Sequence, residues 1–302
     1  MSAHDVEHAN ASPIELVLRP KSKDLGGFPV RRALPAVARR RIGPFVFFDH
    51  FGPTDIPPGQ ESVNVRPHPH IALATITYLF SGEIFHRDSL GTAMAIRPGD
   101  VNWMVAGRGI THSERTSPEV LEKGQHLHGL QAWVALPLDQ EECEPAFYHH
   151  DAAELPARDE GGVRLRIVAG EVFGMKSPLR TASPTLYVDV HFTGAGELDV
   201  GPEYAERAVY VASGEIEIAG QPHGDGDLVV LREGANVTLR ASAAARVMLL
   251  GGAPLDGERH MYWNFVASTK ERIEKAKADW REGRFAKVPG DEVELIPLPE
   301  DA

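Results

Sequence analysis

Short runs of apolar or alternating residues, each closed by glycine, proline or aspartate, repeat along most of this 302-residue chain. Such runs are typical of β-strands, and the closing residues are typical of tight turns. The clearest runs cover residues 71–80, 83–86, 92–96, 101–105, 185–192, 208–211, 215–218, 228–231 and 247–250. A parallel sheet would require long helices between these runs, and no helical pattern of that length separates them. The 29 glycines and 23 prolines fit a chain with many turns. The pattern predicts an all-β protein built from antiparallel sandwiches or barrels.

A weak internal repeat predicts two domains of the same kind. Ser81-Gly82-Glu83-Ile84 recurs as Ser213-Gly214-Glu215-Ile216, each time where a hairpin turn is expected. Gly99-Asp100-Val101 is matched, in the same order, by Gly226-Asp227-Leu228. Two matches in one order favour an ancient duplication over chance.

The length of the chain also fits two domains, because one domain usually takes about 150 residues. The stretch 151–162 is polar and has the composition of a linker. We therefore expect one domain over 1–150, a linker over 151–162 and a second domain over 163–302.

A single helix is predicted near the C-terminus. Ser268 and Glu271 have the spacing of a capping box, and Gly283 stands where the helix should end. Apolar residues at helical spacing lie between them at Ile273, Ala276 and Trp280. We expect this helix to pack against a barrel.

Composition excludes several classes of protein. The chain carries 31 Lys and Arg against 43 Asp and Glu, a net charge of −12, which argues against direct nucleic-acid binding. The one cysteine, Cys143, excludes intramolecular disulfides and multi-cysteine metal sites, and we expect it to be buried. Residues 1–12 lack the apolar core of a signal peptide, and no apolar run is long enough to span a membrane. By elimination, we expect a soluble cytoplasmic protein.

Histidines are concentrated in the first half of the chain, with nine of the 14 between residues 50 and 150. His68-Pro69-His70 and His112-Ser113-Glu114 each place two potential metal ligands at positions i and i+2. On a strand, such positions point to the same face, so two strands could direct three imidazoles and one carboxylate to one point. This donor set leaves coordination positions open, which suits Fe(II), Mn(II), Ni(II) or Cu(II) better than a closed structural zinc site.

Spacing alone leaves other arrangements open. His126 and His128 form another i, i+2 pair that could replace or supplement the first pair. His86 follows an expected strand and fits a supporting role better than a ligand role. Pro69 offers no N–H to a sheet, so we expect the first pair at the start of a strand, near the barrel mouth.

Several longer motifs resemble the pirin family, and the resemblance covers nearly the whole chain, including 265–285. These motifs are Gly43-Pro44-Phe45, His68-Pro69-His70, Tyr78-Leu79, Gly82-Glu83-Ile84, His86-Arg87-Asp88-Ser89-Leu90-Gly91, Pro98-Gly99-Asp100-Val101, Trp103-Met104, Ala106-Gly107-Arg108-Gly109-Ile110, His112-Ser113-Glu114 and His128-Gly129-Leu130-Gln131. The resemblance implies a bicupin, which consists of two antiparallel β-barrels with a C-terminal helix.

The resemblance also implies one mononuclear metal ion, usually iron, in the first barrel. By position, its four ligands would be His68, His70, His112 and Glu114. Fe(II) is the expected ion, with Mn, Ni, Cu or Zn as alternatives. The second barrel resembles a cupin without a metal site, because residues 200–202 and 239–244 stand where the ligands would fall and offer none.

For function, the resemblance implies a quercetin 2,3-dioxygenase-like enzyme that cleaves a flavonol or a related hydroxy-aromatic with O₂. Glu114 would remove or hold the proton of the flavonol 3-hydroxyl. Phe47, Trp103 and Met104 are candidates for the pocket wall. The alternative is an iron-containing, redox-responsive interaction protein with a protein partner, as some pirins are described. We expect no direct contact with nucleic acid or membrane.

One position departs from the family pattern. Many pirins carry Arg-Gly-Phe-Glu-Thr after the first histidine pair, whereas this chain has Ile71-Ala72-Leu73-Ala74-Thr75. Ala74 therefore replaces a glutamate, and any acid–base role of that carboxylate is absent here.

Overall fold

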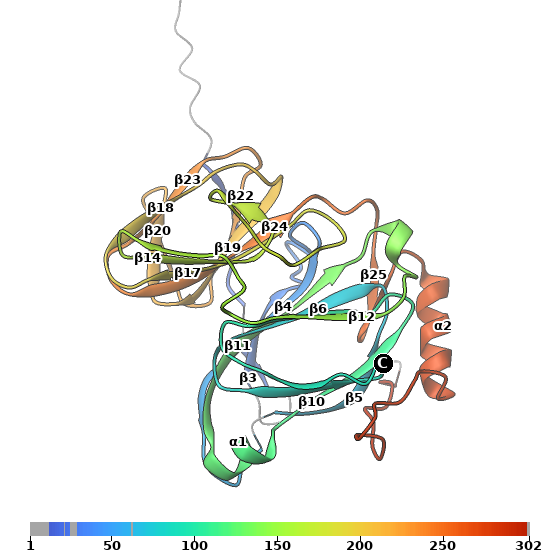
Figure 1. Cartoon of the computed structure of the whole chain (residues 1–302). Coiled ribbons are helices and arrows are strands. Elements are labelled where there is room, and N and C mark those ends of the chain that lie inside the picture. The colour runs from blue at the N-terminus through green and yellow to red at the C-terminus, as the bar shows by residue number, and fades with distance from the viewer. Residues whose placement is uncertain (1–11, 21, 25–28, 62, 301–302) are drawn as a thin grey trace, which may run out of the picture.

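A computed structural model describes residues 12–20, 22–24, 29–61 and 63–300 (Figure 1). Two lobes of β-structure lie next to each other in it, with α2 (Lys270–Arg281) at one end (Figure 1). The N-terminal stretch expected not to be a signal peptide lies outside the described residues, except for Ser12. No helix in the described part of the chain combines the length and the apolar character needed to cross a membrane.

The first lobe is a barrel made of a seven-stranded and a four-stranded antiparallel sheet. From edge to edge, the larger sheet contains β12 (Ala146–His150), β9 (Val101–Val105), β6 (Leu73–Ser81), β11 (Gln125–Ala135), β4 (Phe45–Ile56), β3 (Pro29–Leu34) and β2 (Ser22–Asp24). The smaller sheet contains β5 (Asn64–His70), β10 (Ile110–Arg115), β7 (Ile84–Asp88) and β8 (Ala93–Ile96). The short helix α1 (Pro118–Lys123) and the 3-10 turn η1 (Leu138–Gln140) lie in the connections, where no helix was expected.

The second lobe repeats this plan. Its larger sheet contains β1 (Ile14–Leu18), β22 (Leu228–Leu231), β19 (Glu206–Ser213), β24 (Ala245–Gly252), β17 (Thr185–Phe192), β14 (Val163–Ala169) and β13 (Ala157–Glu160). Its smaller sheet contains β18 (Gly196–Val200), β23 (Val237–Ala241), β20 (Glu215–Ile218) and β21 (Gln221–Gly224). Two small hairpins complete the chain, β15 (Glu171–Val172) with β16 (Met175–Lys176) and β25 (His260–Tyr262) with β26 (Phe265–Ala267).

The strand orders confirm the internal repeat. The central order β9-β6-β11-β4 of the first barrel corresponds to β22-β19-β24-β17 of the second, and β5-β10-β7-β8 corresponds to β18-β23-β20-β21. Gly82 and Gly214 start equivalent turns with φ of +85° and +80°, values that favour glycine. Gly99 donates to the carbonyl of Leu79, as Gly226 does to that of Val211. The expected all-β architecture of two antiparallel barrels is therefore present.

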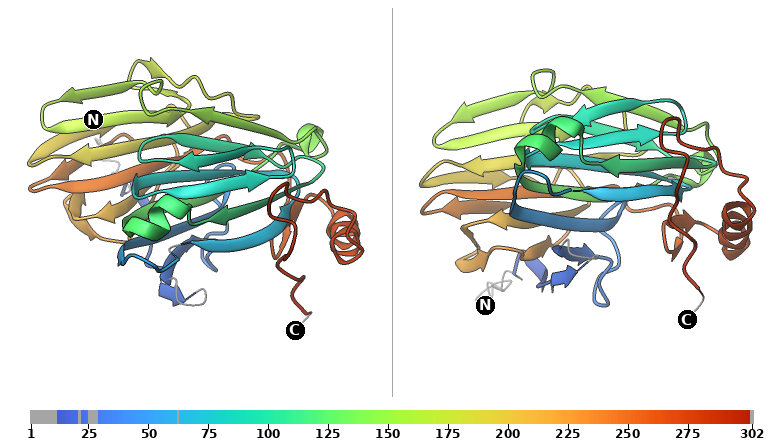
Figure 2. Two further views of the ribbon diagram at one scale, coloured as in Figure 1. Left: turned by 60° about the horizontal axis from the view of Figure 1, so that its bottom comes forward. Right: turned by 90° about the horizontal axis from the view of Figure 1, so that it is seen from below.

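The two ends of the chain are exchanged between the barrels. The N-terminal strand β1 pairs with β22 of the second barrel, whereas Phe265 in β26 forms a bridge with Ile71 of the first. Both views in Figure 2 show the C-terminal helix, in red, beside the first barrel. We keep 151–162 as the proposed boundary between 1–150 and 163–302, with β13 in the second half of this stretch.

The predicted C-terminal helix is present, but its cap lies one residue later than expected. The hydroxyl of Thr269, rather than that of Ser268, accepts from the backbone N–H of Arg272. Ser268 instead donates its hydroxyl hydrogen to Glu141 at 2.7 Å, which removes it from the cap. Gly283 follows the helix with a φ of +69°, as expected for a residue just beyond the C-cap.

The seven-stranded sheets of the two barrels pack face to face around a shared apolar core. Phe48 and Trp103 contribute from the first barrel, and Tyr187 and Met248 from the second. The interior of the second barrel is filled separately by buried aliphatic residues, which include Val200 and Leu239 at the positions equivalent to the ligands. Cys143 is half-buried rather than buried, at the surface of the first barrel. The first barrel, in contrast, has buried histidines that line a cavity, His68 and His70.

Candidate metal centre

Strands β5 and β10 bring three imidazoles together inside the first barrel. His112 lies directly opposite His68 in the antiparallel register, and His70 lies on the same face of β5 as His68. Possible ligand nitrogens of the three side chains lie within 4.8 Å of one another. Their ring centroids are 4.3 Å apart for His68 and His112 and 5.0 Å apart for the two pairs with His70. This convergence is the one that the i, i+2 spacing predicts.

The first pair lies at the end of β5, not at its start as expected. Pro69 is tolerated there because β5 is an edge strand of the four-stranded sheet, where a missing N–H leaves no unpaired neighbour.

Hydrogen bonds fix the orientation of two of these imidazoles. Nδ1 of His68 lies 2.9 Å from the carbonyl oxygen of Arg66, and Nδ1 of His70 lies 3.0 Å from that of Asn264. Because a carbonyl can only accept, both Nδ1 atoms carry the hydrogen and both Nε2 atoms keep a free lone pair. This is the arrangement in which a histidine ligand holds a metal ion.

His112 supplies the clearest test of whether a metal ion fits here. Its side chain is buried, and neither of its nitrogens has a hydrogen-bond partner. A buried unpaired nitrogen costs roughly 1–3 kcal/mol. An ion held by one nitrogen of His112 together with His68 and His70 would remove the cost for that nitrogen, so the donor set fits a metal ion.

The three imidazoles are neutral at pH 7. Burial lowers the pKa of His68 from 6.5 to about 4 and holds the pKa of His70 and His112 well below the usual value. Each neighbouring imidazole lowers the pKa further, because a second positive charge at this distance is unfavourable. Neutral imidazole is the form that binds metal ions, so little proton release is required.

Glu114 lies next to this cluster, outside the group of atoms within 4.8 Å. A bulge in the pairing of β10 with β5 separates it from His112, and its carboxylate lines the same cavity as His68 and His70. The Thr77 hydroxyl lies 3.3 Å from Oε1 of Glu114 and 2.7 Å from Oε1 of Gln131, so one hydrogen serves two acceptors. Burial raises the pKa of Glu114, which makes this carboxylate a stronger base than an exposed one.

A cavity of about 630 Å³ opens beside the cluster and has an aromatic wall. Phe47 and Trp133 stack with ring centroids 4.0 Å apart, and His70 meets the edge of Trp133 at 5.0 Å. On the other side of Phe47, the Arg32 guanidinium lies 4.4 Å above the ring and forms two hydrogen bonds with Asp49. The wall is therefore flat, rigid and connected to the imidazoles.

Of the three predicted wall residues, Phe47 lines this cavity and the other two do not. Trp103 points the other way, into the core shared by the two barrels. Met104 is buried in the same apolar cluster as Phe47 and Trp133, but it does not line the cavity itself. Both faces of β9 are buried, so hydrophobicity could not indicate which face carries the pocket.

The alternative pair His126 and His128 does not take part in the cluster. His126 is exposed and lies 2.6 Å from the carboxylate of Asp55. His128 points toward the second barrel, with its Nε2 atom 2.7 Å from Nε2 of His50, which in turn contacts the Tyr210 hydroxyl at 2.8 Å. These side chains belong to the surface and to the interface between the barrels.

His86 lies beside the imidazole cluster, whereas Ala74 lies away from it. His86 is buried next to His112, with ring centroids 5.4 Å apart, and its Nε2 lies 3.1 Å from Asp88. Ala74 lies in the core shared by the barrels, so a glutamate at this position would point away from the cavity. The departure from the family pattern therefore leaves the cavity wall unchanged.

Sequence reasoning missed Asn264 and Trp133. Asn264 contributes a main-chain carbonyl, which leaves no trace in side-chain chemistry. Trp133 lies two residues after Gln131, the last residue of a motif that resembles the family. On a strand, both side chains point to the same face, and both line the cavity, so this spacing could have indicated Trp133.

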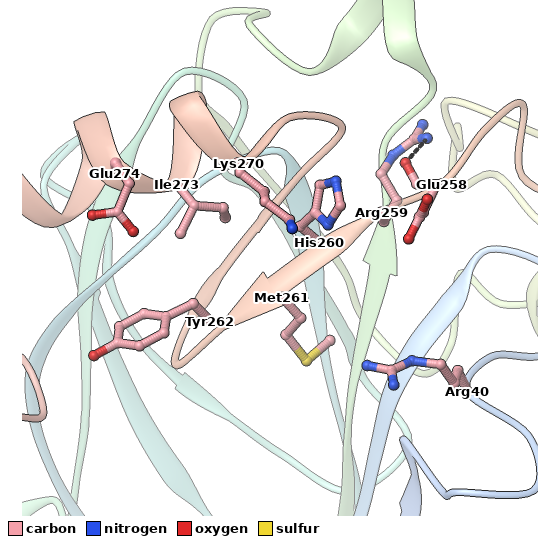
Figure 3. A pocket seen from close by; sticks show the side chains of 9 residues that line it. All are labelled: Arg40, Glu258, Arg259, His260, Met261, Tyr262, Lys270, Ile273 and Glu274. Carbon is pink, nitrogen blue, oxygen red and sulfur yellow. Dashed lines mark hydrogen bonds between the residues drawn. The ribbon is translucent and has the colours of Figure 1, made fainter. Parts of the chain in front are cut away.

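A separate hollow of about 420 Å³ lies between α2 and β25 (Figure 3). Charged side chains of both signs line it, among them Lys270 and Glu274 from the helix and Arg40 from the first barrel. Met261 lines both this hollow and the cavity beside the imidazoles, so it forms part of the wall between them. The hollow has no grouping of imidazoles like that of β5 and β10.

Comparisons with known proteins agree with this geometry. A pirin-like protein of Caulobacter vibrioides is 49% identical over 289 residues, which cover 95% of this chain and all of that protein. The crystal structure of a quercetin 2,3-dioxygenase from Acinetobacter baumannii superimposes with a TM-score of 0.88 at 31% identity and covers 95% of both chains. A bacterial pirin from Escherichia coli in complex with nickel(II) shares the fold, with a TM-score of 0.63 at 16% identity, and covers 80% of this chain and all of that one.

Two family models match the chain in succession. The model described as Pirin matches residues 27–134, and the model described as Pirin C-terminal cupin domain matches residues 187–286. Together with the two barrels of equivalent strand order, these matches confirm the bicupin fold. The chain belongs to the pirin family.

Proposed function

We propose that this chain is a metal-dependent dioxygenase of the quercetin 2,3-dioxygenase type. The observation that carries this proposal is the group of three neutral imidazoles, with free nitrogens, beside an aromatic cavity of about 630 Å³. An open cavity suits a small-molecule substrate, whereas a sealed or flat site would favour the alternative role in protein interaction. The name of the similar Acinetobacter structure points in the same direction.

We assign His68, His70, His112 and Glu114 as the residues that would hold the ion. The three imidazoles and one carboxylate favour Fe(II), with Mn, Ni, Cu or Zn as alternatives. When bound, the ion would supply Lewis acidity toward substrate oxygen and, in the case of iron, one-electron chemistry.

The remaining residues account for binding and proton transfer. The stacked Phe47 and Trp133 rings would hold a flat flavonol against the wall of the cavity. Glu114, whose pKa is raised by burial, would accept the proton of the flavonol 3-hydroxyl. Thr77 would steady the carboxylate through its hydroxyl, and Gln131 would steady Thr77.

The test is oxygen consumption by the iron-loaded protein with a panel of flavonols and catechols, with carbon monoxide measured in parallel. We expect one O₂ consumed for each flavonol cleaved, with release of carbon monoxide. His112→Ala should abolish the reaction, whereas His126→Ala, at an exposed histidine outside the cluster, should leave it unchanged. No oxygen uptake with any compound of the panel would refute the proposal.

A further inference from the structure

A third, positively charged hollow lies on the second barrel and is lined by residues of β13, β14, β17 and β24. Its volume is about 360 Å³, and its lining includes Arg158, Arg164, Arg166, Arg246 and His191. None of its lining residues lines the cavity beside the imidazoles. We infer that this arginine hollow is a binding site for a small metabolite that carries a carboxylate or phosphate group.

The strand register concentrates positive charge in one row. Arg164 of β14 lies directly opposite His191 of β17, and His191 lies directly opposite Arg246 of β24. Facing positions in an antiparallel sheet bring side chains within about 5 Å, where like charges destabilise the sheet. Arg246 and Arg164 accordingly lower the pKa of His191, whose main shift comes from burial. The positive charge of this row is therefore carried by Arg164 and Arg246, with a neutral His191 between them.

The carboxylates of the hollow pair with the two arginines of this row but leave another arginine of the hollow without a partner. Asp189 forms a two-point ion pair with Arg246 and accepts the hydroxyl hydrogen of Tyr78 at 2.8 Å. Asp159 is paired with Arg164 at 2.6 Å. Arg158 lies 3.9 Å from the carboxylate of Glu160. Three of the four arginines of the hollow therefore have a carboxylate partner, and one positive charge is left over in a protein of net charge −12.

Arg166 is the arginine that lacks a carboxylate. It forms no ion pair with any described residue, and its Nε atom is buried without a hydrogen-bond partner. Its guanidinium contacts the Tyr78 hydroxyl from the first barrel, which is neutral because burial raises the pKa of Tyr78 well above its usual value. A guanidinium without an anion in such a place is expected where the anion is a ligand.

The first barrel holds these guanidinium groups in place. The Arg246 guanidinium lies 4.0 Å above the ring of Phe80, and a Cβ atom at Gly99 would collide with Nη1 of Arg166. Both contacts come from the first barrel, and β14, β17 and β24 all lie in the lobe above it (Figure 1). The donors are therefore oriented before a ligand arrives, which lowers the entropic cost of binding.

The chemistry and size of the hollow define the class of ligand. Guanidinium groups bind carboxylate and phosphate oxygens through paired hydrogen bonds, which lysines cannot form. A volume of about 360 Å³ accepts a metabolite but not a double helix, and the negative charge of the whole chain opposes nucleic acid.

The test is isothermal titration calorimetry of the metal-loaded protein with inorganic phosphate and, separately, with succinate, in low-chloride buffer. We expect saturable binding of one or both probes, and the comparison identifies phosphate or carboxylate as the preferred group. Arg166→Gln should weaken this binding at least tenfold. Arg240→Gln removes an exposed arginine of the same barrel that is paired with Glu197, and it should bind as the wild type does.

Two further variants keep the result interpretable. Arg164 lies at an exposed part of the row. Arg164→Gln therefore tests the site even if Arg166→Gln fails to fold. His112→Ala, which removes a proposed metal ligand, should bind the probe as tightly as the wild type, because the hollow is separate from the ion. Absence of binding by either probe would overturn the proposal, as would unchanged binding in both arginine variants or loss of binding in His112→Ala alone.

Discussion

The main-chain carbonyl oxygen of Asn264 lies 3.0 Å from Nδ1 of His70, although the two residues are 194 positions apart in the sequence. The β25–β26 hairpin, which follows the second barrel in the chain, thus reaches back to orient an imidazole of the first barrel. Partners of this kind typically change metal affinity by about 10–100-fold when they are lost. The exchange of chain ends between the barrels is therefore part of the proposed metal site.

This hydrogen bond predicts the protonation state of the imidazoles. In the metal-free protein at pH 7, we expect His68 and His70 to be neutral with the hydrogen on Nδ1, because each Nδ1 faces a carbonyl oxygen. Nitrogen chemical shifts of the ring, measured by NMR with ¹⁵N-labelled histidine, check this directly. A hydrogen on Nε2 of either residue would show that its free nitrogen does not face the ion.

Glu114→Gln tests the proton-accepting role of the carboxylate. The amide keeps the shape of the side chain but cannot take a proton, so we expect kcat for flavonol cleavage to fall by about 10²–10⁴-fold. Steady-state kinetics at matched metal content give the comparison. Glu217→Gln, at an exposed glutamate of the second barrel, serves as the control and should keep full activity. A kcat within twofold of wild type in Glu114→Gln would exclude Glu114 as the base.

Trp133 is expected to bind the substrate ring. Trp133→Leu removes the stacked partner of Phe47, so KM for a flavonol should rise roughly tenfold, which corresponds to about 1.4 kcal/mol of lost binding. Trp133→Phe keeps an aromatic ring and should lie close to wild type. Equal KM values for the leucine and phenylalanine variants would show that the ring does not contact the substrate.

The histidine pair between the barrels predicts a loss of stability in acid. Burial and the nearby Arg246 and Arg31 lower the pKa of His128 from 6.5 to about 4. Between these values the unfolded chain binds more protons than the folded one, so stability is full above pH 6.5 and is lost as the pH falls toward 4. In urea titrations of metal-free protein, His128→Gln should therefore lose less stability over this range than wild type. Identical slopes would mean that His128 titrates normally in the folded state.

The sequence predicted the parts of the structure that depend on side-chain spacing. The i, i+2 rule placed His68 and His70 on one face because β5 is a regular strand, and the repeated Gly82 and Gly214 turns marked equivalent hairpins. The same rule placed Glu114 on one face of β10 with His112, but it could not include the bulge in the pairing with β5 that separates the two residues.

Other features could not be predicted for physical reasons. The face that Trp103 occupies could not be predicted, because the larger sheet of the first barrel is buried on both sides and its strands lose the alternation that marks an inner face. Ser268 and Thr269 are both good caps, and the choice between them depends on Glu141, which is distant in sequence. The Asn264 carbonyl depends on backbone position alone.

Metal content measured by elemental analysis tests the central claim most directly. After anaerobic loading with Fe(II) and removal of free metal, we expect about one ion per wild-type chain. His68→Ala and His112→Ala should retain less than about a tenth of that amount, and His126→Ala should retain all of it. Equal metal content in the wild type, His68→Ala and His112→Ala would contradict the account, because the ion would then be held elsewhere.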